Sequence, residues 1–294
     1  MATELDQAYD HCQRIAKEHA KNFYYAFKTL PTDKRRAIYA TYAFCRLCDD
    51  IADEEMPLEE KDRQFAATRR MLDDSMRGDN DGPVFTALQD AAKVFGIPKE
   101  YFEEVIEGVE MDLTKTRFAN FEELREYCHK VASVVGLVCI EVFGYEDPRA
   151  KEYAIDLGLA MQITNILRDV KEDAERGRVY LPLDEIERYG YSVEELMAGV
   201  VNEPFRRLMA HQAQRARAYF KSGGRLLPLI DQESRVCPAV LHGVYSALLD
   251  RIEASGFEVF ERRIRVSNPR KVMITARHWA GSMMPSRPAP LAKR

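Results

Sequence analysis

Residues 165–173 read Asn-Ile-Leu-Arg-Asp-Val-Lys-Glu-Asp, and this stretch decides the fold. Asn165, Asp169 and Asp173 recur at four-residue spacing, which places their side chains on one face of a helix. The sequence around this row is apolar, so the row fits the wall of a cavity better than a solvated face. Carboxylates at this spacing repel each other, and we therefore expect a cation beside them.

Residues 49–53 read Asp-Asp-Ile-Ala-Asp and form another acidic row, which is the first in chain order, so that residues 165–173 are the second. Asp49 and Asp53 share one helix face, whereas Asp50 is turned away by about 100°. Carboxylate and amide oxygens suit Mg²⁺, which typically joins a few carboxylates to the phosphates of a substrate. The two rows together predict a magnesium and diphosphate site.

The alternative for each row is a solvated acidic helix face. Two rows, each with an arginine nearby (Arg46 and Arg168), favour the cation site. The absence of the D-x-D-x-D-G pattern argues against a calcium-binding EF-hand loop. Cys45 and Cys48 form one C-x-x-C pair without a second pair or paired histidines, which disfavours a zinc or redox site.

Composition indicates an all-α protein. The chain has 294 residues, of which 46% are apolar and 31% charged, while glycine and proline are scarce at 15 and 13. Its net charge of −5 argues against nucleic acid as a partner. We find no signal peptide and no apolar stretch long enough to cross a bilayer.

Helical patterns cover most of the chain. We expect helices over 83–95, 98–114, 121–144 and 149–175. Further helices begin at Thr32, which we expect as N-cap, and after the N-cap Asn202, and another covers Cys237 to Ser255. We predict one domain over residues 1–284 and a disordered, proline-rich, basic tail over 285–294.

Three segments resemble the squalene and phytoene synthase family. Tyr-Ala-Phe-Cys-Arg at 42–46 leads into the first acidic row, and Arg-Val-Tyr-Leu-Pro at 178–182 follows the second. Residues 127–136 resemble a third family segment, and the likeness covers about residues 10 to 280. It implies a single-domain isoprenoid-synthase helical bundle around a central cavity. The whole sequence looks most like the bacterial hopanoid-pathway squalene synthases.

The resemblance also implies the site residues. It implies that Mg²⁺, or Mn²⁺ as the alternative, is held by Asp49, Asp53, Asn165, Asp169 and Asp173. The implied catalytic residues are these four aspartates with Arg46, Tyr127 and Arg168. The implied substrate-binding residues are His19, Lys21, Asn22, Phe23, Phe27, Tyr42, Arg46, Gln162, Asn165, Arg168, Tyr245 and Arg262. The Arg270-Lys271 pair resembles a basic segment that closes over diphosphate.

Two of these residues have specific roles in the family. Tyr127 matches a tyrosine proposed to assist proton removal, although a phenol with a pKa near 10 is a weak base; the alternative is a core tyrosine. Phe27 matches a position that limits cavity depth. A bulky ring there favours C15 over C20 substrates, so we expect a squalene-type rather than a phytoene-type product.

The resemblance implies a head-to-head reaction. Two farnesyl diphosphates condense through presqualene diphosphate to a C30 skeleton, with release of diphosphate. The alternatives are a phytoene synthase acting on geranylgeranyl diphosphate, a chain-elongating prenyltransferase or cyclase, and a non-catalytic helical interaction scaffold. Squalene, hydroxysqualene, dehydrosqualene and presqualene diphosphate all stay open as final product, as do the need for NADPH and the oligomeric state. We expect a cytoplasmic protein; peripheral contact with the inner face of the membrane stays open, because the product partitions into lipid.

Overall fold

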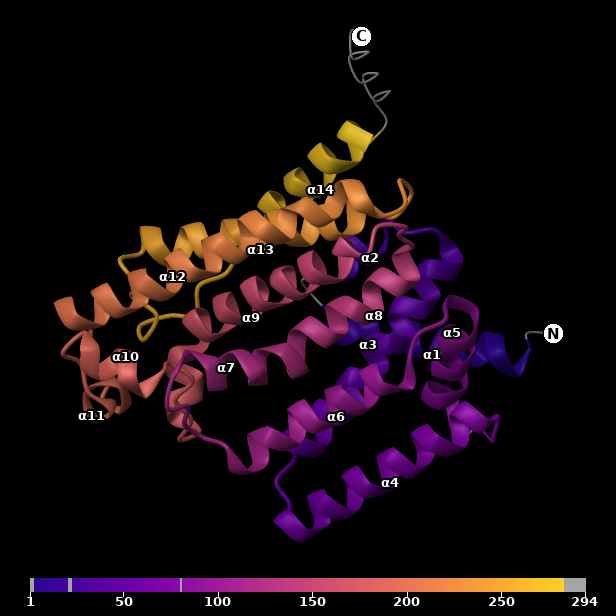
Figure 1. Cartoon of the computed structure of the whole chain (residues 1–294), viewed down its shortest axis with the longest axis horizontal. Helices are drawn as coiled ribbons and strands as arrows, with labels where there is room; N and C mark the ends of the chain where they lie inside the picture. Colours follow the sequence, from indigo (N-terminus) through magenta and orange to yellow (C-terminus); the bar gives the residue numbers. More distant parts are fainter. Residues whose placement is uncertain (1–2, 21–22, 80, 283–294) are drawn as a thin grey trace, which may run out of the picture.

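The computed structural model describes residues 3–20, 23–79 and 81–282. Across these residues every regular element is a helix (Figure 1), and the only β-type pairing is two isolated bridges, Arg117 with Val179 and Tyr145 with Ile230. The predicted all-α class is therefore confirmed.

The helices follow one another with short connections. In chain order they are α1 (Glu4–His19), α2 (Tyr24–Phe27), α3 (Thr32–Asp53), α4 (Leu58–Arg77), α5 (Pro83–Phe95), α6 (Lys99–Thr114), α7 (Phe121–Cys128), the π-helix η1 (His129–Ser133), α8 (Val134–Phe143), α9 (Arg149–Glu175), α10 (Leu183–Arg188), α11 (Val193–Met197), α12 (Glu203–Gly223), the 3₁₀ helix η2 (Gly224–Leu229), α13 (Val236–Ala254) and α14 (Asn268–Ser282).

The long helix α9 lies at the centre of the bundle and packs against α8, α12, α13, η1 and η2. Two glycines permit this close packing. A Cβ on Gly158 would lie 2.6 Å from the Cα of Ser133 in η1, and a Cβ on Gly223 of α12 would lie 2.8 Å from the Cα of Leu157. Both distances are shorter than van der Waals contact, so a larger side chain would push a neighbouring helix away from α9.

The helix predicted over 121–144 is present but not continuous. One turn of π-helix, η1, separates α7 from α8, and the backbone N–H of Val134 bonds to the carbonyl of His129. A π-turn is one residue wider than an α-turn and has no sequence pattern of its own. The prediction of an uninterrupted α-helix was therefore wrong at this turn.

Helix starts follow capping rules in part. The Asn202 side chain accepts a hydrogen bond from the backbone N–H of Phe205 at 3.0 Å, as predicted. Thr32, predicted as an N-cap, is instead the first helical residue, and Pro31 precedes it without a side-chain cap. Proline suits the start of a helix because its φ is fixed near the helical value. Its missing backbone N–H costs nothing there, since the first N–H groups of a helix have no partner within the helix.

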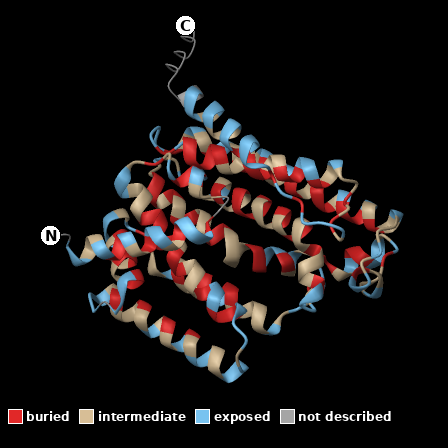
Figure 2. Cartoon of the chain, turned by 180° about the vertical axis from the view of Figure 1, so that it is seen from behind, coloured by how far each residue is buried: buried red, intermediate tan, exposed pale blue. Residues whose placement is uncertain are grey.

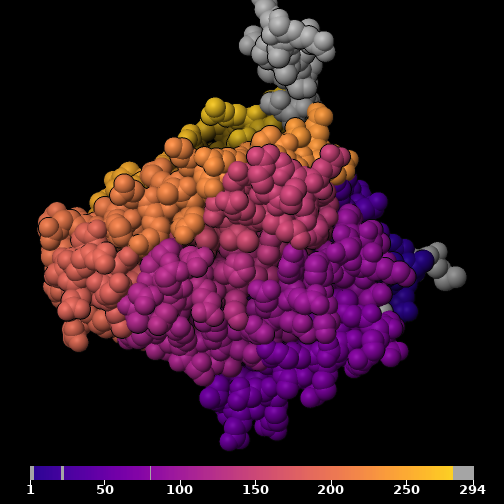
Figure 3. Space-filling model, in the orientation of Figure 1, coloured from indigo at the N-terminus to yellow at the C-terminus, as the bar shows by residue number. Residues whose placement is uncertain are grey.

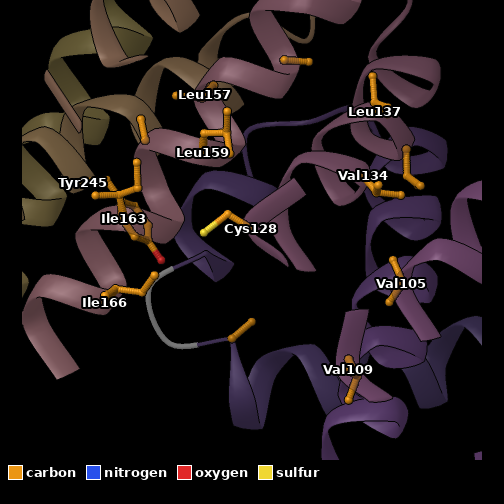
Figure 4. Close-up of a cluster of buried hydrophobic side chains, with 14 of the residues drawn as sticks. Val105, Val109, Cys128, Val134, Leu137, Leu157, Leu159, Ile163, Ile166 and Tyr245 are labelled. Carbon is orange, nitrogen blue, oxygen red and sulfur yellow. The ribbon is translucent and has the colours of Figure 1, made fainter. Parts of the chain in front are cut away.

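The buried side chains form one core along the inner faces of the helices (Figure 2). Figure 4 shows part of it, with Leu157, Leu159, Ile163 and Ile166 of α9 and Tyr245 of α13 among the labelled side chains. None of the helices in the described ranges is long and apolar enough to cross a membrane. The predicted domain limits remain a prediction, since the tail 285–294 lies outside the described residues.

Candidate active site

Two adjoining cavities open between the helices. The inner cavity has a volume of about 330 Å³, and the outer cavity has a volume of about 890 Å³. Phe23 and Tyr245 line both of them, so the two spaces share a boundary. The inner one is mainly apolar and the outer one is rich in basic residues.

Polar groups of the inner cavity come from α3 and α9. Asp49 comes from the first acidic row, and Gln162 and Asn165 come from α9. Asn165 donates a hydrogen bond from Nδ2 to Oε1 of Gln162 at 3.3 Å, while its own Oδ1 is buried without a partner. The remaining wall is mostly apolar, with Phe27 and Val135 among its members.

The two acidic rows lie close enough to influence each other through shared neighbours. Arg176, just beyond the second row, donates from Nη1 to Oδ1 of Asp53 at 3.3 Å. Burial, the largest cause, and repulsion from Asp53 and Asp112 raise the pKa of Asp49 to about 7, against the opposing attraction of Arg46. The Asp49 side chain is exposed, but the surface that it exposes lines the inner cavity. The surrounding protein displaces much of the bulk water there, which explains why its pKa is raised.

Asp173 has a similarly raised pKa. Its side chain titrates at about 7 because burial and repulsion from Asp169 and Asp112 outweigh the attraction of Arg178. Two carboxylates with elevated pKa values at one site indicate electrostatic strain that a bound cation would relieve.

Asp169 is held by arginines from two directions. Arg168 donates from Nε to its Oδ1 at 2.8 Å and forms a second bond to Oδ2, and Arg263 approaches Oδ1 from Nη2 at 2.8 Å. Arg263 also lies 3.5 Å from Oε1 of Glu172. Both arginines line the outer cavity, which places their positive charge beside the second acidic row.

Asp112, which no sequence pattern indicates, connects several groups of the site. Its carboxylate accepts hydrogen bonds from the hydroxyls of Tyr180 at 2.7 Å and Tyr127 at 3.0 Å. Burial raises the pKa of Asp112, and its charge in turn raises the pKa of both Asp49 and Asp173. A single aspartate in the helical sequence of α6 carries no distinctive spacing, so only the packing of α6 against its neighbours reveals it.

Apart from Asp53, Asp169 and Asp173, which are described above and line neither cavity, the predicted site residues fall into three groups. Those that line the inner cavity are Phe23, Phe27, Tyr42, Asp49, Gln162, Asn165 and Tyr245. Those that line the outer cavity are His19, Phe23, Arg168 and Tyr245. Arg46 pairs with Asp50, Tyr127 bonds to Asp112, and Arg262 is exposed beside Arg263. Lys21 and Asn22 lie outside the described residues.

The carboxylates are not gathered around one point. Among the described residues, no three His, Cys, Asp or Glu side chains come together closely enough to hold one metal ion. Mg²⁺ commonly uses one or two carboxylates and completes its shell with water and substrate phosphate. The unpartnered oxygen of Asn165 and the raised pKa values of Asp49 and Asp173 fit that mode of binding.

The arrangement joins an anion-binding surface to an apolar chamber. Arg168, Arg263 and Lys271 on the outer cavity suit a polyanionic group, and aromatic and aliphatic side chains on the inner cavity suit a hydrocarbon chain. A molecule with a phosphate head and a long apolar tail matches both.

Comparisons with known proteins agree with this description. Residues 16–270 match the squalene/phytoene synthase family. A phytoene synthase of Mycobacterium tuberculosis is 39% identical over 284 residues, which cover 96% of this chain and 93% of that protein.

Two solved structures have the same architecture. A dehydrosqualene synthase in complex with ligand superposes with a TM-score of 0.87 at 30% identity, covering 95% of this chain and 97% of that one. The squalene synthase HpnC from Alicyclobacillus acidocaldarius has a TM-score of 0.82 at 28% identity, covering 87% of this chain and 97% of that one. The chain therefore belongs to the squalene/phytoene synthase family of prenyltransferases, as its motifs predicted.

Proposed function

We propose that this protein condenses two farnesyl diphosphates head to head, through presqualene diphosphate, to a C30 squalene-type product. One observation carries the proposal: Asp49 and Asn165, one from each acidic row, line the same apolar cavity. The apolar cavity would hold the hydrocarbon chains, and the two acidic rows would bind the diphosphates through the cation.

The proposed metal ligands are Asp49 and Asp53 of α3 with Asn165, Asp169 and Asp173 of α9. Mg²⁺ is the proposed ion and Mn²⁺ the alternative. When bound, the cation supplies positive charge that helps a diphosphate to leave its allylic carbon. In the structure the carboxylate of Asp169 is paired with Arg168 and Arg263. If Asp169 held the ion, these arginines would be released to bind the diphosphate.

Basic side chains around the outer cavity would receive the departing diphosphate. Arg168, Arg263 and Arg265 line it together with His19 and Lys271. Guanidinium groups donate paired hydrogen bonds that match phosphate oxygens, and this stabilises negative charge as the carbon–oxygen bond breaks. The leaving group would thus stay beside the second acidic row.

The inner cavity would protect the allylic cation from water. Phe23 and Phe27 stack with their ring centroids 6.0 Å apart, and Tyr42 meets the edge of Phe27 at 6.4 Å. Aromatic faces attract positive charge, and an apolar wall excludes the water that would quench it. Attack by the double bond of the second prenyl chain would then form the new carbon–carbon bond.

Closure of the cyclopropane ring requires loss of a proton, and Asp112 is the proposed final acceptor. The phenol of Tyr127 is buried and its pKa is raised well above the ordinary value, so it is a poor base alone. The Tyr127 hydroxyl donates a hydrogen bond to the Asp112 carboxylate. When the Tyr127 oxygen receives a proton from the substrate, its own hydroxyl proton can move to Asp112. The released diphosphate is the alternative base.

Phe27 supports the choice of C15 substrates. The ring is 6% exposed and packs against Phe23, Tyr39 and Tyr42, which restricts its movement out of the inner cavity. A fixed ring on the wall shortens the space for a prenyl chain. The alternative is a phytoene synthase acting on geranylgeranyl diphosphate, and the 39% identical relative named phytoene synthase favours it.

Product analysis tests the proposal. The purified protein is incubated with Mg²⁺ and either farnesyl or geranylgeranyl diphosphate, with and without NADPH, and the lipid and released diphosphate are identified. We expect a C30 product from farnesyl diphosphate, and NADPH changes only its final form. A C40 product in preference would establish the phytoene alternative, a C15 hydrocarbon would indicate a cyclase, and no diphosphate release would refute the proposal.

A further inference from the structure

Helix α14 packs on the bundle through one side only. A Cβ on Gly243 of α13 would lie 2.9 Å from Cγ2 of Ile274 and 3.2 Å from Nε2 of His278. Gly243 therefore lets α14 approach α13 closely, and Ile274 and His278 define the inward side. Lys271, 9% exposed, lies on the same side.

The opposite side of α14 is apolar and exposed. We name it the α14 outer face, and its residues are Val272, Met273, Ala276, Trp279 and Ala280. Val272, Met273 and Trp279 expose 54%, 51% and 55% of their surface. At 3.6 residues per turn these five positions span an arc of about 120°, and Arg270 and Arg277 border it on one edge. Figure 2 shows α14 as a largely exposed helix along the margin of the molecule.

The same end of the sequence is strongly basic. From Arg262 to Arg294 there are nine Lys and Arg residues and no Asp or Glu, although the whole chain has a net charge of −5. The preceding residues therefore carry −14, and the chain is divided into an acidic body and a basic end. Asp231 and Glu233, which share a shallow hollow with Trp279, are paired with Lys34 at 3.1 and 2.9 Å.

The outer cavity lies at the N-terminal end of α14. Residues 263–268 lead into α14 and line that cavity with Lys271. Helix α2, which packs against α14, contributes Tyr25, a cavity-lining residue that is 43% exposed. In the space-filling view α14 forms part of the upper surface of the molecule (Figure 3).

We propose that the α14 outer face docks on an anionic lipid bilayer. A helix with an apolar arc that contains tryptophan and a flanking row of arginines is suited to lie in the membrane interface. The basic end of the chain provides the attraction to anionic headgroups, and the acidic body would face away from the surface. Docking would hold the N-terminal end of α14, where the outer cavity lies, near the lipid. This surface is independent of the reaction assigned above, and its test does not require turnover.

The chain contains a single tryptophan, so its fluorescence reports on Trp279 alone. The probe is a set of unilamellar vesicles of phosphatidylcholine, either alone or mixed with phosphatidylglycerol. We expect the protein to float with the mixed vesicles, with a blue shift of Trp279 emission and quenching by brominated phosphatidylcholine. We expect little flotation with phosphatidylcholine alone, and high salt should weaken the binding.

Paired variants test the surface. Val272→Ser/Met273→Ser should lower vesicle affinity by about tenfold or more, and Arg277→Glu should lower it as well. The matched controls are Val94→Ser/Met197→Ser, at apolar residues 61% and 43% exposed elsewhere, and Arg188→Glu on α10. Thermal unfolding and diphosphate release from detergent-dispersed substrate should stay unchanged in all variants.

Three outcomes would overturn the inference. One is equal flotation of the Val272→Ser/Met273→Ser variant and the parent protein. Another is flotation that does not depend on phosphatidylglycerol. The third is concentration-dependent dimerisation abolished by these substitutions without any vesicle binding, which would identify a second copy as the occupant of this face. A protein that floats but releases no diphosphate would refute only the proposed reaction.

Discussion

Arg176 donates a hydrogen bond to Asp53 at 3.3 Å, and this contact joins the end of α9 to the end of α3 across 123 positions of sequence. It lies at the solvent-exposed edge of the site, with side-chain exposures of 60% and 45%, so it contributes little to stability. Its significance is geometric: the two acidic rows are brought together by folding.

Asp112 provides the sharpest test of the proton route. Asp112→Asn should reduce product formation by about 100-fold or more, because the amide cannot accept a proton from the Tyr127 hydroxyl. Circular dichroism and thermal unfolding check that the protein is folded. Tyr180→Phe, which removes the other bond to Asp112, should have a smaller effect. Undiminished turnover by Asp112→Asn would assign the base to the released diphosphate.

Magnesium should stabilise the protein more at pH 8 than at pH 6. Without metal, the pKa values of Asp49 and Asp173 are raised from 3.8 to about 7 on folding. The two carboxyl groups therefore bind protons more tightly in the folded protein than in the unfolded chain. The stability that this proton binding provides is lost as the pH rises from about 4 to about 7. Ligands must be deprotonated to bind the ion, so its effect increases over the same range.

The measurement is the thermal midpoint with and without Mg²⁺ at both pH values. Asp49→Asn/Asp173→Asn should remove most of the pH dependence of the shift. The metal assignment fails if Mg²⁺ raises the midpoint equally at both pH values or leaves it unchanged at each.

Phe27 should control chain length. Phe27→Ala should raise kcat/KM for geranylgeranyl relative to farnesyl diphosphate by about tenfold or more, since a cavity wall discriminates by the size of the group it excludes. Phe95→Ala serves as control, because that ring lies outside the residues that line the inner cavity. A parent enzyme that already prefers the C20 substrate, or a ratio unmoved by Phe27→Ala, would rule out this role.

Two neighbouring arginines form a matched pair. Arg263→Ala should raise KM for the prenyl diphosphate by about tenfold, because a charge-assisted hydrogen bond is lost, and Arg263→Lys should restore part of it. Arg262→Ala should leave KM nearly unchanged, since only Arg263 lines the outer cavity and pairs with Asp169. The reverse pattern would favour Arg262, the residue that the sequence resemblance indicated.

Gly158 should be intolerant of a side chain. Gly158→Ala should reduce the free energy of unfolding by about 1–3 kcal/mol, as expected when a packed interface is overfilled. Gly224→Ala is the control: its φ is −61° and an added Cβ would meet nothing closer than 3.5 Å. Urea unfolding measures both, and equal stability of the two variants would contradict the packing argument.

The sequence predicted the helices and both acidic rows because helical spacing is local. Four-residue periodicity determines which face Asn165, Asp169 and Asp173 share, whatever the rest of the chain does. Asp112 could not be predicted in this way, because its importance comes from contacts with Tyr127 and Tyr180, which lie on other segments. The charge of residues 262–294 was visible, but its association with an exposed apolar helix face required the packing of α14.

The π-turn η1 sets the relative orientation of the side chains before and after it in one helical stretch. Val134 bonds back to His129, and the extra residue rotates everything after it by about 100° relative to a regular α-helix. Before the turn, Tyr127 is directed to Asp112; within and after it, Val131, Val135 and Cys139 face the inner cavity. If the same residues formed a regular α-helix, the side chains after the turn would be rotated by about 100° relative to Tyr127. The π-turn therefore sets the angle between the wall of the inner cavity and the contact of Tyr127 with Asp112.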